Sequence, residues 1–162
     1  MKRTVQKIIT FFVVVLGICC INKIDAKAFT TGDITYINGQ RYLYSNGQKV
    51  INDFVFDGVY TYYAQADGTP MKDRLTYHPD GVHIIYFDSK GHEVFSNFQY
   101  CPSVGYTCYF DSQGYIYKDQ ITFVDNEPYY LNADGKMEDS GWFRFANGVD
   151  YGYAFDDGSL NC

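Results

Sequence analysis

Residues 129–142 read YYLNADGKMEDSGW, and this stretch contains the features that decide the fold. Tyr130 lies five residues before Gly135, and a bulky residue, Trp142, stands seven residues after that glycine. A glycine that follows a polar turn residue recurs along the chain at intervals of 21, 23, 23, 21 and 23 residues. Each of these glycines is preceded, five positions earlier, by a tyrosine: Tyr42, Tyr63, Tyr86, Tyr109, Tyr130 and Tyr153. The chain is therefore a tandem repeat.

Each repeat combines two turns with two short segments rich in strand-forming residues. Tight hairpin turns need positive φ, which Gly, Asn and Asp adopt easily, and dipeptides such as Asn38-Gly39 and Asp67-Gly68 supply it. An isolated hairpin is only marginally stable in water, so successive hairpins must stack to bury their apolar faces. The spacing predicts an all-β solenoid of about six stacked β-hairpin repeats of 21–23 residues. A β-sandwich is the alternative, but it does not explain the constant position of the tyrosines.

We expect the six spaced tyrosines to pack in the core, with their hydroxyl groups at its wet edge. The residue after each tyrosine is apolar in every repeat: Leu43, Ala64, Phe87, Phe110, Leu131 and Ala154.

The first residues have the pattern of a signal peptide. A basic start is followed by an apolar run at residues 8–21 and by Ala26-Lys27-Ala28, which offers small residues where a signal peptidase reads them. A retained N-terminal anchor and lipoprotein processing at Cys19 are the alternatives. We predict a secreted protein of the cell surface without stable membrane insertion after cleavage. Its parts are a signal peptide at residues 1–28 and a repeat domain at residues 29–162.

Composition and charge exclude several function classes. Aromatic residues make up 19% of the chain, which is too many for a disordered tail. Residues 29–162 carry 8 basic and 18 acidic residues, a net charge of −10. This charge repels nucleic acid and anionic lipid headgroups, so we expect neither as a partner.

The repeats resemble the choline- and glucan-binding repeats, or cell-wall-binding repeats, of Gram-positive secreted proteins. The similarity is strongest at Tyr129–Met137 with Gly141-Trp142 and extends over roughly residues 34–162. It implies a left-handed superhelix of hairpins that serves as a non-catalytic attachment module, with ligands bound in aromatic cages between hairpins. A choline cage of this family would use Trp142 and Tyr151, with a Met such as Met137. The other repeats carry non-Trp residues at the Trp142 position: Phe54, Leu75, Phe98 and Ile121.

These features predict a non-catalytic surface protein that binds cell-wall or extracellular polysaccharide of the glucan type by aromatic stacking. A solenoid that binds a protein partner, as an adhesin does, and a single choline site near Trp142 are the alternatives. The candidate ligand-binding residues are Trp142, Tyr151, Tyr153, Met137, Tyr130, Tyr129, Tyr109, Tyr86, Tyr63 and Tyr42.

The sequence predicts no metal, cofactor or catalytic site. The turn aspartates, such as Asp134, are explained by turn formation, and they lack the spacing of a calcium loop. His78, His83 and His92 have no Cys or Glu partners at metal-ligand spacing, so we interpret them as surface and turn residues.

Cys101 and Cys108 flank a turn centred on Val104-Gly105. If the turn has that centre, the two cysteines lie directly opposite each other across a hairpin, within reach of a disulfide. An extracellular location permits the bond. Cys162 is then left over, either as a free thiol or for pairing between chains.

Overall fold

The computed structural model describes residues 29–161, and this range contains strands and turns but no helix. The predicted signal peptide and Cys162 lie outside the described residues. The strands are β1 (Thr30–Thr31), β2 (Asp33–Ile37), β3 (Gln40–Ser45), β4 (Gln48–Lys49), β5 (Asp53–Phe56), β6 (Thr61–Ala64), β7 (Arg74–Tyr77), β8 (Ile84–Phe87), β9 (Asn97–Cys101), β10 (Tyr106–Phe110), β11 (Gln120–Val124), β12 (Glu127–Leu131), β13 (Gly141–Arg144) and β14 (Tyr151–Ala154).

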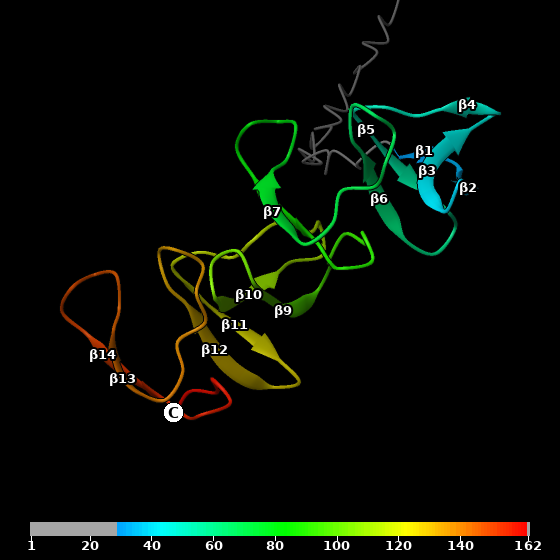
Figure 1. Ribbon diagram of the computed structural model, residues 1–162. Coiled ribbons are helices and arrows are strands. Elements are labelled where there is room, and N and C mark those ends of the chain that lie inside the picture. Colours follow the sequence, from blue (N-terminus) through cyan, green and yellow to red (C-terminus); the bar gives the residue numbers. More distant parts are fainter. Residues whose placement is uncertain (1–28, 162) are drawn as a thin grey trace, which may run out of the picture.

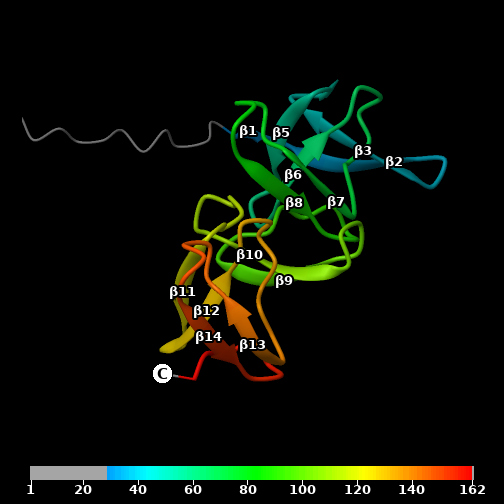
Figure 2. The ribbon, with the colours of Figure 1, turned by 90° about the vertical axis from the view of Figure 1, so that its left-hand side faces the viewer.

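The strands of the described range form six small sheets. Four are two-stranded antiparallel hairpins: β7–β8, β9–β10, β11–β12 and β13–β14. The two N-terminal sheets have a third strand, because β4 joins the β2–β3 hairpin and β1 pairs in parallel with β5 of the β5–β6 hairpin. The sheets follow one another in space from β2–β3–β4 at one end to β13–β14 at the other (Figures 1 and 2). The predicted all-β fold of stacked hairpins is confirmed.

Two-residue turns close hairpins at dipeptides that the sequence marks. Asn38 and Gly39, between β2 and β3, have φ values of 50° and 78°. Asp125 and Asn126, between β11 and β12, reach 51° and 69° without a glycine. Positive φ at both central residues gives the turn a twist that matches the flanking strands, which fixes the hairpin register.

Backbone hydrogen bonds join successive hairpins at one repeating position. We call the six regularly spaced glycines the turn glycines: Gly47, Gly68, Gly91, Gly114, Gly135 and Gly158. In four repeats, the residue two places after a turn glycine donates its N–H to the carbonyl of the residue seven places before the preceding turn glycine. The N–H groups of Glu93, Ile116, Met137 and Leu160 donate in this way to Thr61, Ile84, Thr107 and Pro128, at 2.8, 2.9, 2.8 and 2.8 Å. These bonds satisfy backbone groups that would otherwise be unpaired between hairpins, and they set the step from one hairpin to the next.

The core lies at the position that follows each spaced tyrosine. Leu43, Ala64, Phe87, Phe110, Leu131 and Ala154 are all 0% exposed. The tyrosines point to the opposite face of the strand, since successive side chains alternate. Of these six, Tyr86 and Tyr130 are buried and the other four are partly buried. The expected packing in the core is confirmed for Tyr86 and Tyr130, and Tyr63 packs against the buried Phe54 and Phe87. Tyr42, Tyr109 and Tyr153 are partly buried, which the expectation of a hydroxyl group at the wet edge allows.

No helix among residues 29–161 has the length and apolar character that crossing a membrane requires.

Candidate functional site

The outer face of the C-terminal hairpin carries the most exposed aromatic group of the predicted set. In the β13–β14 ladder Trp142 pairs with Tyr153, and Arg144 pairs with Tyr151. Residues two apart on a strand share a face, so all four side chains lie on the same side. Trp142 is 77% exposed and Tyr151 is 63% exposed. Trp142 meets Tyr153 edge to face, with ring centroids 5.4 Å apart. We call these four residues the aromatic platform.

The inner face of the same hairpin fixes the platform to the preceding repeat. Phe143 is buried and stacks on Tyr130 of β12, with centroids 5.2 Å apart and ring planes at 13°. Its ring lies over Gly152, where an added Cβ would come within 2.3 Å of the Phe143 Cζ atom. Only a glycine on β14 leaves room for this contact. The platform is thus presented by a packed hairpin and not by a loop.

Arg144 changes the chemistry that was predicted for Trp142 and Tyr151. Its guanidinium carbon lies 5.7 Å from the centroid of the Tyr151 ring, a cation–π contact. A positive charge of the protein itself therefore occupies a ring face that a choline cage would offer to the ligand. The Met137 side chain packs against Gly158 and not in a cage with Trp142. An added Cβ on Gly158 would lie 2.5 Å from the Met137 Cε atom.

The other candidate tyrosines are buried or contact neighbouring side chains. Tyr86 is 1% exposed, so its ring cannot stack on a ligand and its selection as a ligand residue is wrong. Tyr129 and Tyr109 both contact the Phe98 ring edge to face, with centroids 4.7 Å and 5.0 Å from it. Tyr63 packs edge to face on Phe54, and Lys49 lies 4.4 Å from the ring centroid of Tyr42. Tyr130 is 2% exposed, so its selection as a ligand-stacking residue is wrong for the same reason, although it borders a groove between two hairpins.

Two histidines have a role that the sequence interpretation missed. His92 stacks on Tyr60 of the preceding hairpin, with centroids 3.7 Å apart, and His83 stacks on Tyr115 of the following repeat at 3.9 Å. Tyr60 and His83 each stand eight residues before a turn glycine. Their partners, His92 and Tyr115, each directly follow the next turn glycine along the chain. The repeat spacing could have revealed them as contacts between repeats.

The His83 ring also contacts the Asp80 carboxylate of its own turn. Burial raises the pKa of the Asp80 carboxyl, but the hydrogen bonds that it accepts from the His83 side chain and from two backbone N–H groups lower the pKa by more. The pKa of Asp80 therefore lies below the usual range.

Cys101 and Cys108 are buried free thiols in the described structure. They are not directly opposite, as had been expected, because Cys101 pairs with Tyr106 and Cys108 with Gln99. The turn includes four residues, closed by the Gly105 N–H on the Cys101 carbonyl at 2.9 Å, and this shifts the register. The two thiols are nevertheless diagonal neighbours on one face, and a hydrogen bond with Cys108, together with burial, raises the pKa of Cys101. The disulfide stays a prediction.

Solved structures of choline-binding proteins share this arrangement of hairpins. CbpJ from Streptococcus pneumoniae matches with a TM-score of 0.63 and 20% identity over 79% of this chain and 41% of that chain. CbpF of the same organism, in complex with ipratropium, matches with a TM-score of 0.58 and 23% identity over 80% and 42%. The chain has the choline- and glucan-binding repeat fold. No family model and no curated protein matches its sequence.

The same repeat fold occurs in an alternansucrase. An alternansucrase in complex with isomaltotriose matches with a TM-score of 0.57 and 27% identity over 66% of this chain and 10% of that chain. The chain spans less than half the length of each of these three proteins. Within the repeat fold, the platform is where this chain retains its single Trp.

Proposed function

We propose that this protein is a non-catalytic, exported surface protein that binds cell-wall or extracellular polysaccharide of the glucan type by stacking sugar rings on exposed aromatic side chains. The observation that carries the proposal is the platform, where Trp142 and Tyr151 are exposed side by side with Tyr153 on a packed hairpin. Sugar rings present faces of C–H groups, which pack on aromatic rings. Exposed aromatic side chains that are gathered on one face are typical of interaction sites.

Two further observations favour a glucan over choline. The Arg144 guanidinium over the Tyr151 ring repels a quaternary ammonium group but leaves the Trp142 ring open to a neutral sugar. The alternansucrase, which matches at 27% identity, was solved with isomaltotriose, a glucan fragment. The alternative of a single choline site near Trp142 is less favoured for the first of these reasons.

Affinity electrophoresis in gels that contain dextran tests the proposal. Trp142→Ala should weaken the affinity for dextran, as read from the retardation, about 2- to 13-fold, because one aromatic stacking contact contributes about 0.5–1.5 kcal/mol. The matched control is Tyr36→Ala, which removes an aromatic ring that is 67% exposed on the first hairpin. Equal retardation of wild type and Trp142→Ala in dextran and in gels that contain purified cell walls would refute the platform. Capture of a protein together with failure to bind either polymer would support the alternative of a protein-binding solenoid.

A further inference from the structure

Three Asn-Gly dipeptides lie in turns of the chain, and their surroundings differ. They are Asn38-Gly39 between β2 and β3, Asn46-Gly47 between β3 and β4, and Asn147-Gly148 between β13 and β14. In such a dipeptide the backbone nitrogen of the glycine can attack the side-chain amide carbon of the asparagine, because the glycine has no Cβ to hinder the approach. Hydrogen bonds of the side-chain amide or of the glycine N–H compete with this attack.

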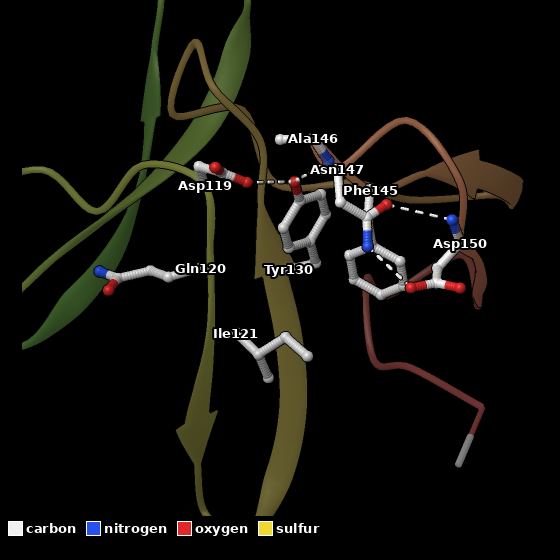
Figure 3. A pocket seen from close by; sticks show the side chains of 8 residues that line it. All are labelled: Asp119, Gln120, Ile121, Tyr130, Phe145, Ala146, Asn147 and Asp150. Atoms are coloured by element: carbon white, nitrogen blue, oxygen red, sulfur yellow. Dashed lines mark hydrogen bonds between the residues drawn. The ribbon is translucent and has the colours of Figure 1, made fainter.

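The Asn147-Gly148 turn engages both reacting groups. The Asn147 side chain accepts from the Val149 and Asp150 N–H groups, both at 3.0 Å, and donates to Asp150 Oδ2 at 2.7 Å. Figure 3 shows the two bonds between this side chain and Asp150. The Gly148 N–H donates to the Phe145 carbonyl at 2.9 Å, which holds the proton on the nitrogen that would attack. Four hydrogen bonds therefore oppose the reaction at this turn.

The Asn38-Gly39 and Asn46-Gly47 turns leave both reacting groups free. All four residues are exposed. Within residues 29–161, no hydrogen bond engages the side chain of either asparagine or the N–H of either glycine. A Cβ on Gly39 or Gly47 would meet nothing within 4 Å, so both turns have open space in which a ring can close. These two turns can react without first losing a hydrogen bond of either reacting group.

We propose that Asn38 and Asn46 are sites of spontaneous deamidation in the folded protein and that Asn147 is protected from it. The glycine nitrogen loses its proton to hydroxide and bonds to the asparagine Cγ atom. The Cγ–Nδ2 bond breaks, and the side-chain nitrogen takes a proton from water and leaves as ammonia. Water then opens the resulting succinimide at one of its two carbonyl carbons, which gives aspartate or isoaspartate. Water is the only co-reactant, and nothing is oxidised or reduced.

Isoaspartate at position 46 has a structural consequence, because β4 contacts the second repeat. It adds one carbon to the main chain of the turn before β4, a strand that pairs with β3 through only two residue pairs. The Nζ atom of Lys49, in β4, lies 4.4 Å from the centroid of the Tyr42 ring. The same side chain packs against the turn glycine Gly68, where an added Cβ would lie 2.5 Å from the Lys49 Cδ atom. A longer turn therefore loosens the contact between the first two repeats.

Peptide mapping by mass spectrometry tests the assignment. The full chain is incubated at mildly alkaline pH in water labelled with heavy oxygen, and digestion in unlabelled water follows, so that the label marks the residues that reacted in the folded protein. We expect Asn38 and Asn46 to be converted at least ~10-fold faster than Asn147, because Asn147 must first lose several hydrogen bonds. In concentrated urea the three dipeptides should react at similar rates, since unfolding removes these bonds. Equal rates at the three asparagines in the folded chain would overturn the inference.

Two variants supply matched controls. Asp150→Ala removes the acceptor of the Asn147 amide and should speed the conversion of Asn147 at least ~3-fold, with no change at Asn38 and Asn46. An unchanged Asn147 rate would contradict protection by hydrogen bonds. Asn46→Asp has the added charge without the added carbon, so it should keep the wild-type urea midpoint, whereas the chromatographically isolated isoaspartate form should unfold at lower urea. Equal midpoints for these two proteins would overturn the consequence for β4.

Discussion

The close stacking of repeats depends on the regularly spaced turn glycines, of which Gly91, after β8, is one. Gly81, in the turn between β7 and β8 of the same repeat, allows this dependence to be measured. Gly91 and Gly81 have φ values of 86° and 74°, so an alanine is strained at both. A Cβ on Gly91 would lie 3.0 Å from the Met71 carbonyl oxygen and 3.3 Å from the Pro70 Cβ, both in the preceding repeat. A Cβ on Gly81 would have nothing within 4 Å. The pair therefore separates backbone strain from packing between repeats.

Gly81→Ala should lower the free energy of unfolding by about 1–2 kcal/mol, the cost of a left-handed conformation for a residue with a Cβ. Gly91→Ala should lower it by a further ~1–3 kcal/mol, because the contact is with backbone and a proline ring, which cannot move aside like a flexible side chain. Urea unfolding followed by far-ultraviolet circular dichroism measures both values. Equal destabilisation of the two variants would refute the idea that turn glycines are required for close stacking.

Two further predictions concern the third and fourth hairpins. Mass spectrometry of the protein after oxidation should show a Cys101–Cys108 disulfide. Closing a loop of this length should stabilise the fold by about 2.5 kcal/mol in a chain-entropy estimate. Two free thiols after oxidation would contradict this prediction. The second prediction concerns Tyr86, whose pKa is raised to about 12 by burial and by the nearby Cys101 and Asp73. Its protonated hydroxyl therefore stabilises the fold fully below pH ~10, the pKa of a tyrosine in the unfolded chain. This contribution is lost as the pH rises towards 12. Tyr86→Phe should abolish that part of the alkaline loss in urea titrations, and an unchanged pH profile would show that another group titrates.

Local interactions explain why so much of the fold was predictable. The turn dipeptides fix hairpin positions through the φ preference of a few neighbouring residues, as at Asn38-Gly39. The five-residue spacing between Tyr130 and Gly135 recurs in every repeat, because each hairpin packs against an equivalent surface of the neighbouring hairpin. The register of Cys101 against Cys108 was mispredicted for an equally local reason, since a four-residue turn replaced the expected one.

The sequence alone determined that the chain is an array of aromatic-rich β-hairpins and that Trp142 stands apart from the other repeats. Only the tertiary structure decided which face of each strand is buried, because strand alternation allows either face and the contact with the next hairpin selects the residue after each tyrosine. The same contacts bury Tyr86, leave Trp142 exposed at the last hairpin and bring Asp119 to the same groove as Asp150. Sites formed between repeats depend on residues far apart in sequence, so hairpin stacking, and not the repeat motif, determines where a ligand can bind.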